Sequence, residues 1–430
     1  MKKVGLVFII AFSSLLAGCS MVNNDEDSVD VLISAGDQHT VIINDAGDVL
    51  SWGASLYGVL GNDESNADSN YATPLTITDA FDFEEGDTLT HLSSGNNHTL
   101  ALVSDGRIFG WGHNLVGQVG DLEAEIVRVP TDITESFNLN NDEVIVDIVS
   151  EQYNVALTST GRVFVWGSNH TGGLAHQSTS DNQGIPHEKV PVDITDYFVL
   201  EDEEVITSIG INKVLTSDGR VFVWGDVFLD FEENDFHPKN ITSDLSLEND
   251  ETIKKIFSDN DIILTSNDRV LVLGVKSTLG QTGSNGKQIH TEDITEAFNF
   301  DANETLKFVT QGNTYTILVS TQNRVFAWGE NTYGQLGDGT TDFVVPPFFN
   351  ENATEASILS ITDHFDFESE ETITAISAGG NHTLLLTSHN RVFTWGRNHK
   401  GQLGNRSFDN QLLPVEITEH ITQNQQDKTY

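Results

Sequence analysis

Short stretches in which both alternating faces are hydrophobic recur along the whole chain. Residues 162–166 are typical: Phe164 and Trp166 share one face of an expected strand, and Val163 and Val165 share the other, because strand side chains alternate with a period of two. A strand that is apolar on both faces must be covered on both sides by neighbouring sheets. The pattern therefore predicts an all-β protein built from short, buried strands.

The Trp-Gly pair that ends this strand recurs at intervals of about 50–70 residues, which indicates an internal repeat. Leu273-Gly274 takes the same place in the fifth of seven units. All six tryptophans of the chain occupy this position: Trp52, Trp111, Trp166, Trp224, Trp328 and Trp395. We expect these tryptophans to be structural and buried between neighbouring sheets.

Each unit indicates four short strands. The second strand begins with His-Thr, as in 98–103, and a two-residue turn such as Asp105-Gly106 leads into the third. The fourth is a short run with a proline, which suits an outer edge. Seven such units over residues 31–420 predict a seven-bladed β-propeller of four-stranded antiparallel blades.

A stacked solenoid is the alternative architecture. The first and last units carry the same pattern and show no polar capping variant, so a closed ring is favoured. A last strand near Val415 that joins the first blade would close that ring.

A glycine-rich motif follows the third strand and is clearest in 328–337, Trp-Gly-Glu-Asn-Thr-Tyr-Gly-Gln-Leu-Gly, and in 395–404. Its later glycines are Gly334, Gly337, Gly401 and Gly404. Together with the Gly-x-x-His-Thr element, this motif resembles the regulator of chromosome condensation repeat family. The resemblance implies a seven-bladed propeller with a protein-binding role.

Some members of that family drive nucleotide exchange on a small nuclear GTPase, and some bacterial members are secreted and bind other proteins, including β-lactamases. The sequence has no insertion resembling the wedge that acts in exchange. Exchange activity is therefore not expected of this chain.

Three histidines, His39, His98 and His382, begin the second strand in units 1, 2 and 7. Tyr153 and Tyr315 hold the same place in units 3 and 6. Zinc needs nitrogens about 2.1 Å away, whereas packed sheets lie about 10 Å apart. A hydrogen bond that fixes the inner loop is favoured over a metal site, because tyrosine can also make such a bond.

An acidic loop such as 81–87, Phe-Asp-Phe-Glu-Glu-Gly-Asp, recurs at six junctions between units. We expect its apolar residues to anchor it and its carboxylates to point outward. A solvated, solubilising surface is the favoured interpretation of these carboxylates. A basic protein partner steered by their negative potential and a calcium site are the alternatives. The acid at the sixth position after the first apolar residue is the candidate partner contact in each loop: Asp87, Glu143, Glu204, Glu251, Glu304 and Glu371.

An arginine follows the hairpin turn in six units: Arg107, Arg162, Arg220, Arg269, Arg324 and Arg391. This regularity favours structural ion pairs with nearby carboxylates over ligand binding. Units 4 and 5 are degenerate, since unit 4 lacks the His-Thr pair and unit 5 lacks the tryptophan. Drift in blades that still pack and a specialised binding face both remain open.

The N-terminus has the order of a processing signal: a basic start, an apolar run too short to span a bilayer, and Leu-Ala-Gly-Cys. This order resembles the lipobox of bacterial lipoproteins, which implies a signal peptide over 1–18 and lipid attachment, including palmitate, at Cys19. Residues 19–30 are then an acidic tether, and 421–430 form a polar C-terminal tail. The resemblance implies a bacterial cell-envelope protein that is held by lipid and faces outside the cytoplasm.

Composition narrows the function. Lys+Arg total 21 against 65 Asp+Glu, a net charge of −44, which argues against nucleic-acid binding. No nucleophile elbow, phosphate-binding loop or His-Glu-x-x-His motif is present. We therefore expect no enzyme and no cofactor, but a scaffold for an unidentified protein partner of basic character. A channel-site enzyme and an ion- or glycan-binding propeller are the alternatives.

Overall fold

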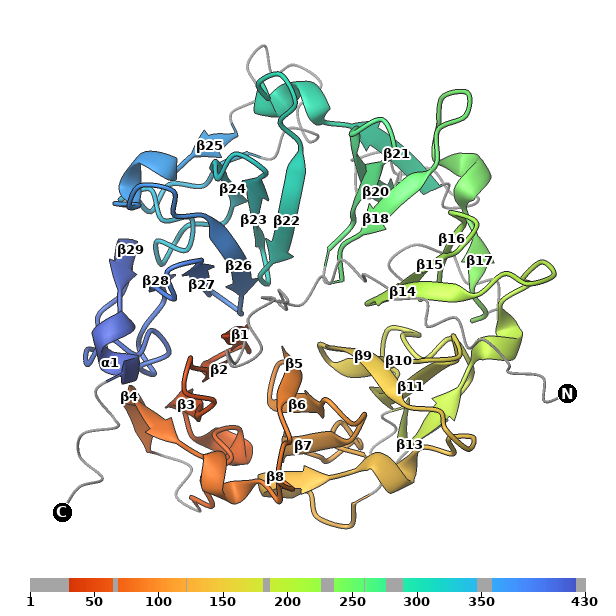
Figure 1. Cartoon of the computed structure of the whole chain (residues 1–430), viewed down its shortest axis with the longest axis horizontal. Coiled ribbons are helices and arrows are strands. Elements are labelled where there is room, and N and C mark those ends of the chain that lie inside the picture. Colours follow the sequence, from red (N-terminus) through yellow and green to blue (C-terminus); the bar gives the residue numbers. More distant parts are fainter. Residues whose placement is uncertain are drawn as a thin grey trace, which may run out of the picture.

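The computed structural model describes residues 31–64, 69–120, 122–180, 186–225, 236–258, 260–275, 289–345 and 358–422. The predicted signal peptide, Cys19, the acidic tether and most of the predicted tail lie outside these ranges. The described residues form seven antiparallel sheets arranged as blades around a common axis (Figure 1). The predicted seven-bladed β-propeller is confirmed.

The blades share one strand order, in which the first strand lies nearest the axis and the fourth lies at the periphery (Figure 1). The first strands are β1 (Leu32–Ala35), β5 (Leu89–Ser94), β9 (Ile145–Ser150), β14 (Ile206–Gly210), β18 (Ile253–Ile256), β22 (Leu306–Gln311) and β26 (Ile373–Ala378). The second strands are β2 (His39–Ile43), β6 (His98–Val103), β10 (Tyr153–Thr158), β15 (Lys213–Thr216), β19 (Ile262–Thr265), β23 (Tyr315–Ser320) and β27 (His382–Thr387).

The third strands are β3 (Val49–Ala54), β7 (Ile108–His113), β11 (Val163–Ser168), β16 (Val221–Val223), β20 (Val270–Val275), β24 (Val325–Gly329) and β28 (Val392–Gly396). The fourth strands are β4 (Asn70–Thr76), β8 (Ile126–Asp132), β13 (Pro186–Asp193), β17 (Lys239–Asn240), β21 (Ile289–Asp293), β25 (Leu359–Ser360) and β29 (Gln411–Glu416). Blade 3 also carries β12 (Thr179–Ser180), which pairs with β13.

Both faces of the middle strands are buried, as the hydrophobic pattern predicts. Every residue of β10 is buried, and so are the first five of β11. The structure places the six tryptophans, each at most 3% exposed, in the hydrophobic layers between blades.

A threonine after the fourth strand joins the third strand in every blade. In blade 1 the Thr78 hydroxyl accepts the Val49 N–H at 2.9 Å, and in blade 5 the Thr295 hydroxyl accepts the Val270 N–H at 2.8 Å. The equivalent bonds of the other blades are 2.9–3.1 Å long. This bond fixes the peripheral corner of each blade.

The ring closes without strand exchange. β29 pairs with β28 in its own blade, so the expectation that the last strand joins the first blade is wrong. Blade 7 instead meets blade 1 through a shared hydrophobic cluster that includes Trp52 and Leu384. Backbone contacts such as Arg406 N–H to Ala72 O, at 2.8 Å, complete the seam.

The described helical segments are short. The α-helix α1 (Thr418–Thr422) covers five residues and buries Ile421. No helix in the described ranges has the length and hydropathy required to cross a membrane.

Candidate functional site

Trp52, Trp111, Trp224 and Trp395 join neighbouring blades through their indole N–H groups. Trp395 Nε1 donates to Gln335 O of blade 6 at 2.9 Å, and Trp52 Nε1 donates to Gln402 O of blade 7 at 2.8 Å. Trp111 and Trp224 make the same kind of bond to the preceding blade. These bonds satisfy the buried indole N–H groups and hold the ring together. Trp166 differs, because its buried indole N–H has no hydrogen-bond partner among the described residues.

The repeat glycines make room for these indoles. A Cβ on Gly337 would lie 2.8 Å from Trp395 Nε1, and one on Gly404 would lie 2.8 Å from the same atom of Trp52. Both glycines also have a positive φ, which side chains disfavour. The glycine motif is therefore required where one blade meets the next.

The three histidines also bridge blades. His39 Nε2 lies 2.9 Å from Thr99 Oγ1, and His382 Nε2 lies 3.0 Å from Thr40 Oγ1. His98 Nε2 lies 2.7 Å from Asn154 Oδ1. The favoured hydrogen-bonding interpretation is thus the one seen, and no cluster of three metal-ligating side chains occurs within the described ranges.

The tyrosines at this place make equivalent bonds. The Tyr315 hydroxyl lies 2.9 Å from Thr383 Oγ1, and the Tyr153 hydroxyl bonds to Asn212 Oδ1. The interchange of His and Tyr follows, because either side chain can reach the next blade.

Burial keeps the histidines neutral. Burial lowers the pKa of His39 and of His382 to about 3, helped at His39 by His382 and His98. Burial also lowers the pKa of His98 to about 4, although its bond to Asn154 opposes the shift. These rings are therefore hydrogen-bonding groups at neutral pH, without charge.

The six candidate contact acids point inward, so the prediction that they point outward is wrong. The side chains of Glu143, Glu204, Glu251, Glu304 and Glu371 are 0% exposed, and that of Asp87 is 9% exposed. Each pairs with the arginine that follows its hairpin turn. Arg162–Glu143 and Arg391–Glu371 are 2.8 Å apart, and the predicted structural arginine pairs are confirmed.

Local geometry explains why these acids turn inward. Glu143 Oε2 also accepts the Asn140 N–H at 2.9 Å, and the guanidinium of Arg162 lies 4.7 Å from the centre of the Phe164 ring. Burial alone would raise the pKa of Glu143, but bonds from Thr158, Thr160, Asn140 and Arg162 together lower it to about 2. The acid closes its loop and is inaccessible to a partner.

The neighbours of these acids are the exposed ones. The same loops bring the hairpin turns to the same face of the propeller, since Arg107 bonds both Asp105 of its turn and Asp82 O of the loop. We call this surface the acidic face. Its exposed loop acids include Glu84, Glu85, Asp142, Glu201, Asp202, Glu203, Glu248, Asp250, Asp301, Glu368 and Glu370.

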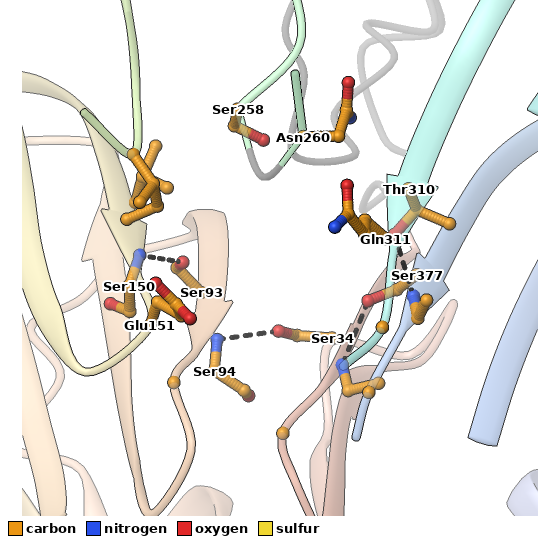
Figure 2. Close-up of a pocket in the computed structure, with 18 of the residues that line it drawn as sticks. Ser34, Ser93, Ser94, Ser150, Glu151, Ser258, Asn260, Thr310, Gln311 and Ser377 are labelled. Atoms are coloured by element: carbon orange, nitrogen blue, oxygen red, sulfur yellow. Dashed lines mark hydrogen bonds between the residues drawn. The ribbon is translucent and has the colours of Figure 1, made fainter. Parts of the chain in front are cut away.

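A central cavity of about 580 Å³ lies within the first strands and the loops that follow them. In four consecutive blades a hydroxyl on the first strand accepts a backbone N–H of the next blade (Figure 2). These acceptors are Thr310, Ser377, Ser34 and Ser93, at 2.8–3.0 Å. Sequence reasoning missed this row, although a serine or threonine two residues before the glycine was its visible signal.

Blades 4 and 5 depart from this arrangement. Only two residues separate β14 from β15, so the Gly-x-x-His segment is missing, and Phe257 stands in blade 5 where the hydroxyl would be. Lys213, 1% exposed, donates to Ile211 O at 3.3 Å and to Ser258 O at 3.5 Å. Burial raises the pKa of Asp261, and the nearby Lys213 limits that shift.

The fold and its contacts define a seven-bladed propeller built from one repeated unit. Family models for the regulator of chromosome condensation (RCC1) repeat match it. One model matches residues 31–59, 89–118, 307–335 and 373–402, and a second matches 46–102, 322–386 and 389–424. The chain belongs to the regulator of chromosome condensation repeat family, and these matches fall on blades 1, 2, 6 and 7.

Curated relatives are similar over much of the chain. The ultraviolet-B receptor UVR8 of Arabidopsis thaliana is 24% identical over 381 residues, which are 87% of this chain and 78% of the receptor. The human X-linked retinitis pigmentosa GTPase regulator is 26% identical over 339 residues, 77% of this chain but 30% of the regulator.

Solved structures show the same fold at lower identity. Yeast RCC1 (Prp20) bound to Kap60 has a TM-score of 0.66 and 17% identity, covering 94% of this chain and 90% of that one. Human WBSCR16 has a TM-score of 0.63 and 18% identity, covering 86% and 93%.

Proposed function

We propose that this protein is a lipid-anchored, extracytoplasmic scaffold that binds a basic protein partner through its acidic face, without catalysis. The observation that carries the proposal is the division of charge in the loops. Six arginines are committed to interior pairs with one acid of each loop, whereas the flanking acids are exposed. The exposed acids create a negative potential that accelerates association with a cationic surface.

The relatives support a binding role. One yeast structure contains Prp20 bound to Kap60, and another reports the binding of Prp20p to Gsp1p and histones. Propellers of this family act mostly as regulators or binders, and the present chain offers the same kind of rigid frame with variable loops. A protein-binding role follows for this chain as a proposal.

Binding is tested with the full chain as bait for envelope and secreted proteins, washed at low and high salt. We expect a stoichiometric partner that is retained at low salt and lost at high salt. Neutralising five acids of the acidic face, Glu201, Asp202, Glu203, Glu248 and Asp250, to their amides should slow association with that partner about tenfold at low salt.

The matched control neutralises acids on the opposite face. Glu123→Gln with Glu125→Gln changes the exposed loop between β7 and β8 and should leave association unchanged. A partner that binds equally well to both variants, or no partner under either wash, would contradict the acidic-face proposal.

The anchor rests on the N-terminal sequence, which has a basic start, an apolar run and the chain's only cysteine. The Cys19→Ser variant should lose incorporation of a labelled fatty acid and leave the membrane fraction. Retention of both properties by the variant would contradict lipid attachment at Cys19.

A further inference from the structure

The acidic loops can be compared with one another, because the same segment occurs at six junctions between blades. The second residue of the loop is Asp82, Asn138, Val199, Ser246, Asn299 or Asp366. The residue after the inward-pointing acid is Thr88, Val144, Val205, Thr252, Thr305 or Thr372. The second residue of the strand that follows is Thr90, Val146, Thr207, Lys254, Lys307 or Thr374. At these positions, apolar residues occur in two consecutive loops alone.

The four valines are exposed and belong to the loops that enter and leave blade 3. Val199 is 78% exposed, and Val144, Val146 and Val205 are each 38% exposed. A single exposed valine needs no explanation. Here, however, the other junctions carry Asp, Asn, Ser, Thr or Lys at the same positions. We call these four residues the valine strip.

The hairpin turn of blade 3, residues 159–161, lies between two of these valines. Val144 O accepts the first N–H of this turn at 2.8 Å, and a Cβ on Gly161 would lie 3.4 Å from Val205 Cβ. Val146 is the extra residue of a bulge at the start of β9. Because β9 and β14 are neighbouring inner strands, these three valines share one sector of the acidic face (Figure 1).

The arginine pair of blade 4 presents the fourth valine to solvent. Arg220 donates to Val199 O at 2.9 Å and to Glu204 Oε1 at 2.9 Å. These bonds hold the loop backbone against the blade and leave the Val199 side chain outside. A partner therefore meets a loop that is already ordered, which lowers the entropy cost of binding.

Exposed acids flank the valine strip. Residues 201–203, Glu-Asp-Glu, lie between Val199 and Val205 and are exposed, and Asp142 is exposed two residues before Val144. The arginines of these two loops are paired with buried acids and do not cancel this charge. An apolar centre with a charged rim is the arrangement found in protein interfaces, where the centre supplies affinity and the rim supplies steering.

We propose that the partner docks on the valine strip with a basic segment in which a large apolar side chain stands between lysines or arginines. The apolar side chain covers the valines, and the cations on both sides of it pair with the exposed acids. A partner that is only cationic leaves the valines uncovered. This inference rests on the proposed binding role of the acidic face and adds the chemistry that the partner must present.

The test compares two synthetic peptides of equal charge on the full chain. They are Lys-Lys-Leu-Lys-Lys-Leu-Lys-Lys and the same peptide with serine in place of leucine, and fluorescence anisotropy at low salt measures both affinities. We expect the leucine peptide to bind about tenfold more tightly, because leucine buries apolar surface against the valines and serine does not. Amides at the five acids named above should weaken both peptides.

The test variant gives the valine strip residues that the chain already carries at these positions. Val144→Thr, Val146→Thr and Val205→Thr copy the loop that enters blade 7, and Val199→Asn copies Asn299. The variant should fold for this reason. The leucine peptide should lose most of its advantage, to within about twofold of the serine peptide, whose own affinity should not change. Val199→Asn alone is the second variant and should reduce the advantage in part.

A matched control changes exposed valines outside the acidic loops. Val190→Thr with Val345→Thr alters side chains that are 45% and 40% exposed, and Thr73 already takes the place of Val190 in blade 1. The control should keep the full preference for the leucine peptide. Loss of that preference in the control would remove the assignment to the valine strip.

The other outcomes separate this inference from the proposed function. Equal affinity of the parent for the two peptides, or a leucine preference that the strip variant keeps, would overturn the valine strip. Weakening of both peptides by the five amides would still support the acidic face in that case. Binding that the five amides leave unchanged would count against the acidic face itself. The absence of binding by the leucine peptide at about 1 mM would overturn both.

Discussion

Blades 7 and 1 meet through contacts that blades 4 and 5 lack. At the first seam, a hydroxyl–amide bond joins Ser377 to Ala35, His382 reaches Thr40, and Trp52 donates to Gln402 O. At the second, Leu273 stands in the tryptophan position, and Ser258 O accepts Ile211 N–H at 2.6 Å and the Lys213 ammonium at 3.5 Å. The two seams belong to one ring but are built differently.

The comparison distinguishes the contacts that stabilise a single blade from the contacts that join the blades into a ring. Blades 4 and 5 keep the corner threonine and the arginine–glutamate pair, which are contacts within the repeat unit. At the seam between them, the indole, histidine and hydroxyl contacts are missing from the part of the chain that the structure describes, although Trp224 of blade 4 still donates to Gly173 O of blade 3. A blade can therefore lose some of its inter-blade contacts and still fold.

The largest expected effect is at the tryptophan position. Trp395→Ala should lower the free energy of unfolding by about 3–5 kcal/mol, because it removes a buried indole and its bond to blade 6. Leu273→Ala in blade 5 should cost about 2 kcal/mol, since a smaller side chain without an inter-blade bond is lost. Urea denaturation measures both, and an equal cost would remove the distinction between the seams.

The arginine–glutamate pair should not distinguish the two regions. Glu371→Gln in blade 7 and Glu251→Gln in blade 5 should each lower the free energy of unfolding by about 1–3 kcal/mol, because a charge-assisted bond to a buried carboxylate is lost. The control Glu370→Gln changes an exposed neighbour and should have an effect below about 0.5 kcal/mol. Unequal costs for Glu371 and Glu251 would show that the pair also depends on the seam.

Acid should weaken the histidine seams. The pKa of His98 is about 4 in the folded protein against an ordinary value of 6.5, so the unfolded chain binds more protons between these values. Stability therefore falls as the pH drops from about 6.5 to 4, and this residue contributes on the order of 2 kcal/mol of that loss at pH 5. Asp147 acts in the opposite direction, because burial raises its pKa to about 7.

The His98→Tyr variant tests how much His98 contributes to the pH dependence of stability. Tyr153 already makes the equivalent bond to an asparagine in the next seam, so the variant should fold and lose less stability between pH 7 and pH 5 than the parent. Thermal unfolding across this range measures the difference. An unchanged pH dependence would show that His98 does not carry the acid sensitivity.

The smallest expected effect is at the hydroxyl row. Ser34→Val copies the residue found in blade 3 and leaves the Ser94 N–H without its acceptor, which should cost about 1 kcal/mol. Ser136→Val, in the half-buried turn after β8, is the reference for the substitution itself. A cost equal to the reference would mean that the hydroxyl row does not stabilise the seam between blades 1 and 2.

Much of this fold could be predicted from the sequence, because each blade repeats the same local chemistry. The Trp-Gly spacing gave the blade count, and the regular arginines indicated ion pairs. The direction of Glu143 could not be predicted, since it depends on Arg162 and the Asn140 N–H meeting in space. The blade that β29 joins could not be predicted either, because sequence periodicity does not determine which strands pair.

The candidate site was less predictable than the fold. Ser34 and Ser377 are ordinary residues in sequence, and their common role appears only when their strands surround one axis. Lys213 stands where other blades carry an aliphatic residue, and the shortened loop of blade 4 brings it to the cavity. Such sites form where residues of several blades meet around the axis, so the sequence of a single repeat does not reveal them.

Hydrogen exchange of the full chain, followed by mass spectrometry, tests the central comparison most directly. The account predicts that amides of β14 and β18 in blades 4 and 5 exchange faster than those of β26 and β1 in blades 7 and 1, because fewer side-chain contacts restrain their seam. Equal protection in the two regions, or slower exchange in blades 4 and 5, would contradict it.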